Sequence, residues 1–381
     1  MRRLVLAGAG HAHAQVLLAW AQSPPPDVEL VLVSPHALAP YSGMVPGWLA
    51  GTYAFDEIVI DFPRLCHAAG ARWIASSIAR LDPDARTLQL DNGESLSYDW
   101  LSLNIGSTLT PPPGEFASRF LSMRPLANLH TDYDQLLDDW CGDRSNRPFR
   151  VTAVGGGAAG FESVLAVLRR LRTLRPERRV EGCLMARSTE LLPGYPRAAR
   201  RKALQALRDA DVRLQLGADW CDSVGHSSDL VLWATGAQAH AWQRRPELRG
   251  NLAVSGEGYV LIDANLRSLS HPNIFASGDC AQWRTPLPKA GVYAVRMGPV
   301  LTHNLGAVMN AALSGSAPQA YRPQRVFLSL LATADGSAIA SRGTFFSLSG
   351  RWAWRLKEHI DRGFVKRFAP AASHPTLDHS A

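Results

Sequence analysis

The stretch LVLAGAGHAH, residues Leu4–His13, runs from a short apolar segment directly into a glycine-rich turn. The apolar part is too short for a helix and ends at a glycine, which predicts a buried strand of a parallel sheet. Helical spacing follows over Ala14–Ala21, three prolines break it, and Val28–Val33 predicts the next strand. We therefore expect a strand–helix–strand unit at the start of the chain.

A glycine turn between a strand and a helix lets backbone N–H groups approach a phosphate at the positive end of the helix dipole. Gly8 and Gly10 fit this pattern. His13 stands where the third glycine is usual, and Ser34 stands where an acid usually holds a ribose. On its own, this first turn leaves open a tight structural turn that binds nothing.

A second glycine turn follows the predicted strand Val151–Val154 and matches the dinucleotide pattern in full. Its glycines are Gly155, Gly157 and Gly160, with Glu162 close behind. Glu162 faces two interpretations, a residue near a bound nucleotide or a partner of the helix dipole.

The strand that closes this second unit, Val180–Met185, leads into Ala186-Arg187-Ser188 rather than an acid. An acid there would favour NADH, whereas Arg187 suits the 2′-phosphate of NADPH. The alternative for Arg187 is a solvated surface charge.

The strongest single signal is NIFASGD, residues Asn273–Asp279, an apolar strand that delivers a glycine and an aspartate to the start of a helix. Gly278 permits close backbone approach, and the Asp279 carboxylate can accept hydrogen bonds from a polyol such as the ribityl chain of FAD. The two glycine turns in the same chain favour this interpretation over a simple helix cap.

The order of these units predicts an α/β fold with two Rossmann-like domains, the first interrupted by the second. We expect an FAD domain over residues 1–115 and 255–325, and an NAD(P) domain over 116–254. Residues 326–370 should form a hairpin around Asp335-Gly336 and a basic amphipathic helix, with a disordered tail at 371–381. The apolar stripe of that helix is predicted to be Trp352, Leu356, Ile360, Phe364 and Phe368.

Composition excludes several classes of protein. The surplus of positive charge, +7, is spread along the chain, so it favours an anionic partner only weakly, and we expect no nucleic acid. No apolar run is long enough to span a bilayer. The five cysteines have neither dithiol nor zinc-site spacing, and no other set of residues suggests a metal site, so we expect a cytoplasmic protein with reduced thiols.

Together these motifs resemble, over almost the whole chain, the FAD-dependent pyridine nucleotide–disulfide oxidoreductase superfamily. Tyr98–Ser107 is similar to that superfamily's YDYLVIATGS segment, with Asn104-Ile105 in place of Ala-Thr, and Leu232–Ala237 resembles its second such segment. The dithiol of the disulfide reductases is missing, so the chain looks most like the branch that contains type II NADH dehydrogenases.

A narrower resemblance is to the flavoprotein module fused to selenophosphate synthetase (selenide, water dikinase). It rests on four segments: Gly8–Leu17, Pro40–Gly47, Leu287–Leu305 and Trp354–Phe368. No kinase module is present, so a link to selenium rests on analogy alone.

The resemblance implies roles for the matched positions. For FAD these are Gly8, Gly10 and His13 at the pyrophosphate, Asp279 at the ribityl chain and Pro46 beside the isoalloxazine, and for NAD(P)H they are Gly155, Gly157 and Gly160. We also expect cofactor contacts, without assigning them to one cofactor, from His11, Ser34, Gly106, Gly236 and Gly278. Gly291-Val292 would begin a helix that faces the flavin pyrimidine. The implied catalytic residues are Glu162, which would orient the nicotinamide or relay a proton, and Lys289, which would add positive charge unless it is a surface lysine.

We therefore expect an FAD-dependent NAD(P)H:acceptor oxidoreductase whose acceptor is a quinone or a small chalcogen compound. One alternative is a flavoenzyme that oxidises an inorganic sulfur or selenium compound without NAD(P)H; another is a non-catalytic FAD-binding redox sensor or partner protein. The tail helix, residues 352–368, either contacts the inner face of a membrane peripherally or packs against its own body or a homodimer partner.

Overall fold

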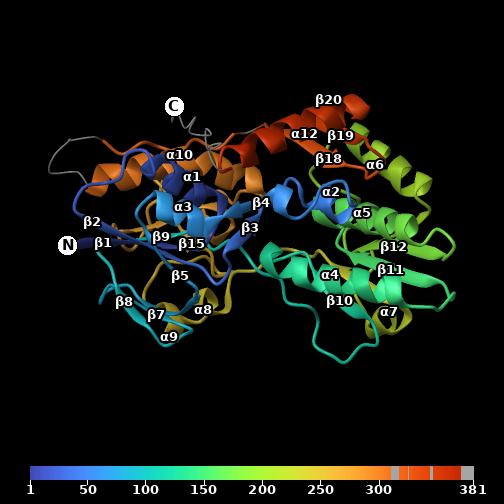
Figure 1. Ribbon diagram of the computed structural model, residues 1–381, viewed down its shortest axis with the longest axis horizontal. Coiled ribbons are helices and arrows are strands. Elements are labelled where there is room, and N and C mark those ends of the chain that lie inside the picture. The colour runs from blue at the N-terminus through green and yellow to red at the C-terminus, as the bar shows by residue number, and fades with distance from the viewer. Residues whose placement is uncertain (310–316, 325, 344–345, 370–381) are drawn as a thin grey trace, which may run out of the picture.

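The computed structural model describes residues 1–309, 317–324, 326–343 and 346–369. The predicted disordered tail, 371–381, lies outside the described residues. Two lobes lie side by side in Figure 1, each built on its own parallel sheet.

The first sheet has five strands in the order β16-β9-β1-β2-β5, and all neighbouring strands are parallel. The strands are β1 (Arg2–Ala7), β2 (Val28–Val33), β5 (Arg72–Ile74), β9 (Trp100–Leu103) and β16 (Ile274–Ala276). Helices α1 (His11–Trp20) and α10 (Gly291–Met309) pack against each other over this sheet, with α3 (Phe62–Ala68) beside α1 (Figure 1). The apolar residues that predicted β1 and β2 are buried over Leu4–Ala7 and Leu30–Val33.

The second sheet has the order β10-β14-β11-β12-β13 and is also entirely parallel. Its strands are β10 (Arg119–Ser122), β11 (Phe149–Val154), β12 (Val180–Ala186), β13 (Val212–Leu216) and β14 (Leu230–Trp233). Its helices are α4 (Leu126–Gly142), α5 (Ala158–Leu174), α6 (Arg197–Asp209) and α7 (Asp222–Ser227). The chain leaves the first sheet after β9, builds the second, and returns to the first with β16, which confirms the predicted fold class. The exact domain limits stay a prediction.

Smaller elements lie outside the two parallel sheets. Antiparallel strands β6 (Ile78–Asp82), β7 (Thr87–Leu90) and β8 (Ser95–Ser97) include the hairpin predicted around Asp91-Asn92-Gly93. The remaining short elements are β3 (Leu38–Pro40), α2 (Val45–Leu49), η1 (Asp56–Ile58), β4 (Val59–Asp61), α8 (Ala241–Arg244), α9 (Pro246–Arg249), β15 (Val260–Leu261), η2 (Gly278–Cys280) and β17 (Ala281–Gln282).

The C-terminal region lies against the second lobe (Figure 1). It has three antiparallel strands, β18 (Leu328–Ala332), β19 (Ala338–Arg342) and β20 (Phe346–Gly350), followed by α12 (Arg351–Lys366). The turn at Asp335-Gly336 and the helix were predicted, whereas β20 was not.

The predicted apolar stripe of α12 is wrong in its first part. Trp352 and Ile360 are each 44% exposed, while the buried face runs through Ala353, Lys357, Asp361 and Phe364. Hydrophobic periodicity failed because this helix buries a charged pair, which an apolar pattern cannot reveal. None of the helices within the described ranges has the length and apolarity needed to cross a bilayer.

Candidate functional site

A cavity of about 850 Å³ lies between the lobes and is lined by residues that follow the carboxyl ends of strands in both sheets. In open parallel sheets this edge is where ligands bind. Many of the predicted site residues line it: Gly8, Gly10, His11, Ser34, Pro46, Gly106, Gly157, Glu162, Gly236, Gly278, Asp279, Lys289 and Gly291. The other predicted positions do not: His13, Gly155, Gly160, Arg187 and Val292.

The first glycine turn is packed tightly against Asn104 at the end of β9. Gly8 has a positive φ of 101°, and a Cβ on Gly10 would lie 2.0 Å from Asn104 Oδ1. That oxygen accepts a hydrogen bond from the backbone N–H of Ala12 (3.1 Å), while Nδ2 donates to Ser277 O (2.8 Å). Asn104, a departure from the superfamily segment, thus joins the start of α1 to the ends of β9 and β16.

The buried side chain of His13 stabilises this turn through hydrogen bonds. Its Nδ1 donates to Gly8 O (2.8 Å), so its Nε2 accepts from the Ser102 hydroxyl (2.8 Å). Burial lowers the pKa of His13 to about 4, which keeps the ring neutral. Its side chain therefore faces the protein interior and not the cavity, contrary to the contact with a pyrophosphate that the resemblance implied.

His11, by contrast, lines the cavity. Its ring meets Tyr41 edge-on at 5.3 Å, and its buried Nε2 has no hydrogen-bond partner within the described residues. Burial lowers the pKa of His11 to about 4 against the opposing charge of Asp279. A buried ring nitrogen left without a partner at the cavity wall suits a site whose polar ligand completes the hydrogen bonding.

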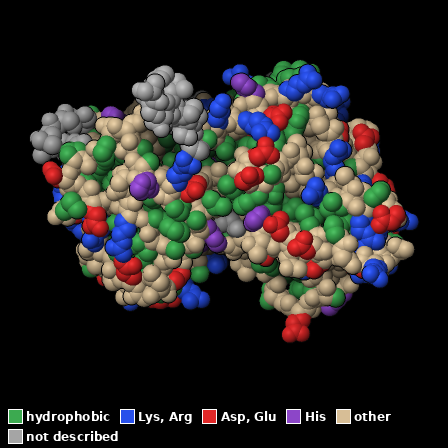
Figure 2. All heavy atoms as spheres, viewed as in Figure 1, with side chains coloured by type: hydrophobic (Ala, Val, Ile, Leu, Met, Phe, Trp, Pro, Cys, Tyr) green, Lys and Arg blue, Asp and Glu red, His purple; other side chains and the backbone are tan. Residues whose placement is uncertain are grey.

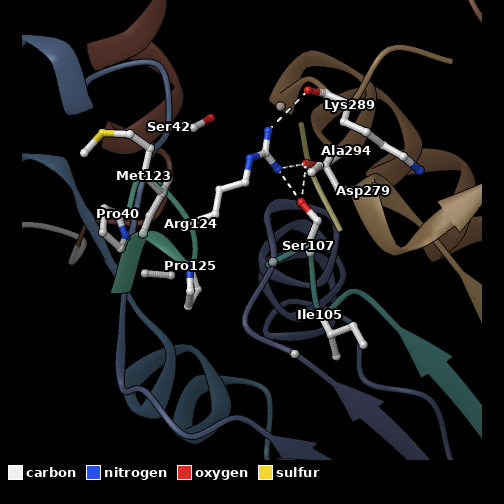
Figure 3. A pocket seen from close by; sticks show the side chains of 18 of the residues that line it. Pro40, Ser42, Ile105, Ser107, Met123, Arg124, Pro125, Asp279, Lys289 and Ala294 are labelled. Atoms are coloured by element: carbon white, nitrogen blue, oxygen red, sulfur yellow. Dashed lines mark hydrogen bonds and ion pairs between the residues drawn. The ribbon is translucent and has the colours of Figure 1, made fainter. Parts of the chain in front are cut away.

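The predicted aspartate lines the cavity and is paired with an arginine that the sequence did not reveal (Figure 3). Arg124, two residues after β10, forms an ion pair with Asp279 and donates to Ser107 Oγ (2.5 Å) and Lys289 O (3.3 Å). An arginine beside a carboxylate can hold both the phosphate and the hydroxyl groups of a nucleotide cofactor. The only sequence feature that could have suggested Arg124 is its position two residues after a strand that ends at the cavity. Its contact with Asp279 forms only when the two lobes dock.

Lys289 has its ammonium engaged elsewhere. Its Nζ donates to Ala281 O (2.9 Å) and lies 3.6 Å from the Tyr259 ring centre, and in Figure 3 the side chain extends away from Arg124. Burial lowers the pKa of Lys289, although the charge of Asp279 opposes this. The catalytic role of Lys289 stays a prediction. Of the two cations, Arg124 is the one whose charge lies beside Asp279.

In the second turn, a side chain at two of the glycines would clash with the protein backbone. A Cβ on Gly155, where φ is 131°, would lie 2.2 Å from Ala234 O, and one on Gly160 would lie 1.9 Å from Gly155 O. A Cβ on Gly157 would meet no protein atom within 4 Å, although this residue lines the cavity. The open side of Gly157 is what close approach of a phosphate requires.

Glu162 connects the second turn with the C-terminal region. Its Oε1 accepts a hydrogen bond from Ala332 N (2.7 Å), at the end of β18. Burial raises the pKa of Glu162 to about 7, against the opposing charge of Lys357 on α12. A carboxyl group that titrates near neutral pH at a cavity wall can hold or release a proton there.

Comparison with known proteins agrees with this geometry. The family model "Pyridine nucleotide-disulphide oxidoreductase" matches residues 2–298. The chain belongs to this family. Members of the family, and the relatives named below, are oxidoreductases.

The chain is similar to the alternative NAD(P)H-ubiquinone oxidoreductase C1 of Arabidopsis thaliana, with 25% identity over 74% of this chain and 62% of that protein. Among solved structures it is similar to NDH2 of Plasmodium falciparum in complex with NADH (TM-score 0.73, 13% identity, 96% of this chain and 98% of that one). It is also similar to an engineered water-forming NADPH oxidase bound to NADPH (TM-score 0.66, 21% identity, 89% of this chain and 74% of that one). At these identities the solved structures establish the fold alone, and the chain spans only about three fifths of the first curated relatives.

The family uses FAD and NAD(P)H in general, and the residues present fit both groups. The unpartnered His11 nitrogen, the Asp279–Arg124 pair and the open side of Gly157 supply polar contacts at separate points of one cavity. The narrower likeness to the selenophosphate synthetase module stays a prediction from sequence motifs.

Proposed function

We propose that this chain is an FAD-dependent oxidoreductase that takes a hydride from NAD(P)H and passes electrons to a quinone or another small acceptor. The observation that carries the proposal is the single cavity lined by residues of both glycine turns, with Asp279 at one part of its wall and Glu162 at another. Both proposed nucleotide sites would thus open into one space, as hydride transfer between two cofactors requires.

Most of the cavity residues would bind the cofactors, and Glu162 would in addition handle a proton. Gly8, Gly10 and Asn104 shape the first phosphate turn, and Asp279 with Arg124 would hold the polyol and phosphate groups of FAD. When bound, FAD supplies the redox chemistry by accepting a hydride and releasing electrons. Gly157 would admit the diphosphate of the nucleotide donor, and Glu162 would orient the nicotinamide or hold a proton at its carboxyl oxygen.

For the donor, we propose NADPH over NADH. The strand β12 ends at Ala186, and no carboxylate follows it directly at the position that usually binds a 2′-hydroxyl. Arg187 is exposed and forms no ion pair within the described residues. The engineered oxidase bound to NADPH carries three consecutive replacements, an aspartate by alanine and the next two residues by arginine and serine. This chain has the same triplet, Ala186-Arg187-Ser188, naturally.

The acceptor must reach the cavity directly. The five cysteines lie far apart in the sequence and none has a second cysteine at the spacing of a redox dithiol, so we propose that electrons leave the flavin without a protein dithiol. A quinone is our first candidate, because the curated relative from Arabidopsis thaliana is an NAD(P)H-ubiquinone oxidoreductase, and a small chalcogen compound is the second.

The tail helix supports peripheral contact with a membrane rather than complete packing against the body. Trp352 and Ile360 are exposed on α12, together with Arg351 and Arg355, and exposed Phe346 and Leu348 lie on adjacent β20. Figure 2 shows hydrophobic and basic side chains next to each other along the edge of the molecule where α12 and β20 lie. An apolar surface bordered by cations suits an anionic lipid surface.

A turnover assay tests the proposal against its alternatives. The purified protein should oxidise NADPH with a soluble quinone analogue well above the background rate with oxygen. Turnover with sulfide or selenide but not with NADPH would instead favour the inorganic-donor flavoenzyme. If none of these donors supports turnover, a non-catalytic FAD-binding sensor would be favoured.

A further inference from the structure

Helix α12 places its charges and its apolar side chains on unexpected sides. It exposes Trp352 and Ile360, yet the side chains of Lys357 and Asp361 are only 8% and 9% exposed. Burying two charges costs solvation that their mutual attraction does not reliably recover, so a buried pair is poor evidence for a stabilising role. The role of the Lys357–Asp361 pair must therefore be inferred from the groups that it contacts.

Both charges contact a single loop. Lys357 Nζ donates to Gly43 O (2.5 Å) and to Asp361 Oδ2 (2.7 Å), and the Tyr41 hydroxyl lies close to the Asp361 carboxylate. A Cβ on Gly43 would lie 2.8 Å from Asp361 Oδ1, which shows how closely the loop approaches the helix. The Tyr41 ring also packs on Phe364 of α12 at 4.7 Å.

The other side of the same loop forms part of the cavity wall. Ser42, Val45 and Pro46 line the cavity, and a Cβ on Gly291 at the start of α10 would lie 2.5 Å from Ser42 Oγ. The loop is thus held between the buried pair of α12 and the first residue of α10. Neither Lys357 nor Asp361 lines the cavity itself.

We propose that Lys357 and Asp361 are positioning residues of the flavin site, which fix the loop Tyr41–Gly47 against the start of α10 and so set the cavity wall beside the bound flavin. The proposal rests on the FAD site of the proposed function but not on its donor or acceptor. It assigns a C-terminal helix, more than 300 residues from the loop in sequence, to the cofactor site.

The test is a size-matched apolar replacement of the whole pair, Lys357→Met with Asp361→Leu. Replacing both charges avoids leaving one buried and unpaired, so the fold should survive. The loop loses its hydrogen bond to Lys357 and its contact with Asp361, and flavin release on dilution, followed by flavin fluorescence, should be about 10- to 100-fold faster. The visible circular dichroism of the bound flavin should change as well, and His359→Gln, on the exposed side of the same helix, should change neither readout.

If the double variant does not fold, Tyr41→Phe provides the second test, because it removes only the hydroxyl that lies beside the Asp361 carboxylate. A several-fold faster release with an altered flavin spectrum would support the proposal. A folded variant with wild-type release and spectrum would overturn it. A protein that binds FAD but is not reduced by NADPH would contradict the proposed function alone, whereas these flavin-retention measurements would still decide this proposal.

Discussion

Glu162 shows at the scale of one residue how neighbours change what a side chain can do. The glycine motif located it at the start of α5, but its surroundings come from β18 and α12, more than 160 residues away in sequence. Burial raises the pKa of the Glu162 carboxyl to about 7, while the charge of Lys357 lowers this pKa and that of Asp361 raises it. No local pattern could supply that environment.

This environment predicts a pH dependence. Because the pKa of Glu162 is raised to about 7, the carboxyl carries its proton below that pH and loses it above. If this proton serves the reaction, turnover should fall as pH rises through 7. Glu162→Gln should lower kcat by roughly 100-fold and remove that inflection, as a steady-state pH profile would show. An unchanged profile in the variant would exclude a role for the carboxyl as a proton donor.

Arg187 permits a prediction about the donor. A guanidinium that binds a 2′-phosphate contributes charge-assisted hydrogen bonds that NADH cannot form. Arg187→Ala should therefore lower kcat/KM for NADPH by roughly 10- to 100-fold and leave kcat/KM for NADH nearly unchanged. Equal losses with both donors would contradict the assignment of Arg187 to the 2′-phosphate.

At the scale of elements, the strands and glycine turns could be predicted, and the site between them only in part. Short apolar runs ending in glycine identify β1, β11 and their turns because that pattern is local. Arg124 could not be assigned, since its contact with Asp279 exists only after the two lobes dock. The buried face of α12 was missed for the related reason that its charges are satisfied by a distant loop.

The second glycine turn allows a matched pair of substitutions. Gly157→Ala adds a methyl group that meets no protein atom, so the melting temperature and FAD content should stay unchanged. The same methyl group would obstruct phosphate approach, and the KM for NADPH should rise by at least about tenfold. Gly155→Ala, by contrast, meets Ala234 O in a strained conformation and should destabilise the fold by ~1–3 kcal/mol. A Gly157→Ala protein with normal KM would exclude a phosphate at this turn.

The exposed side of α12 predicts lipid binding. Wild-type protein should sediment with vesicles containing anionic phosphatidylglycerol more than with neutral phosphatidylcholine vesicles. Replacing Trp352 and Ile360 together by alanine should weaken binding about tenfold or more, because each buries apolar surface in the lipid interface. Leu269→Ala removes another exposed apolar side chain, outside the C-terminal region, and serves as the control. Equal binding by wild type and the double variant would count against the membrane contact.

At the scale of the whole molecule, the order of the chain explains why one cavity collects groups from so many segments. The first sheet is left after β9 and completed by β16, so the second lobe is inserted with its strand ends facing the same space. The C-terminal region then contributes Ala332 to Glu162 and α12 to the loop beside the cavity. Binding of two cofactors side by side is the arrangement that this architecture supports.

The most direct test of that account is an anaerobic titration of the purified yellow protein with NADPH, followed by the visible absorbance of its flavin. Our proposal predicts that the absorbance of the oxidised flavin is lost as NADPH is added, with NADH much less effective. A protein that holds FAD but keeps its full absorbance with either nucleotide would contradict it.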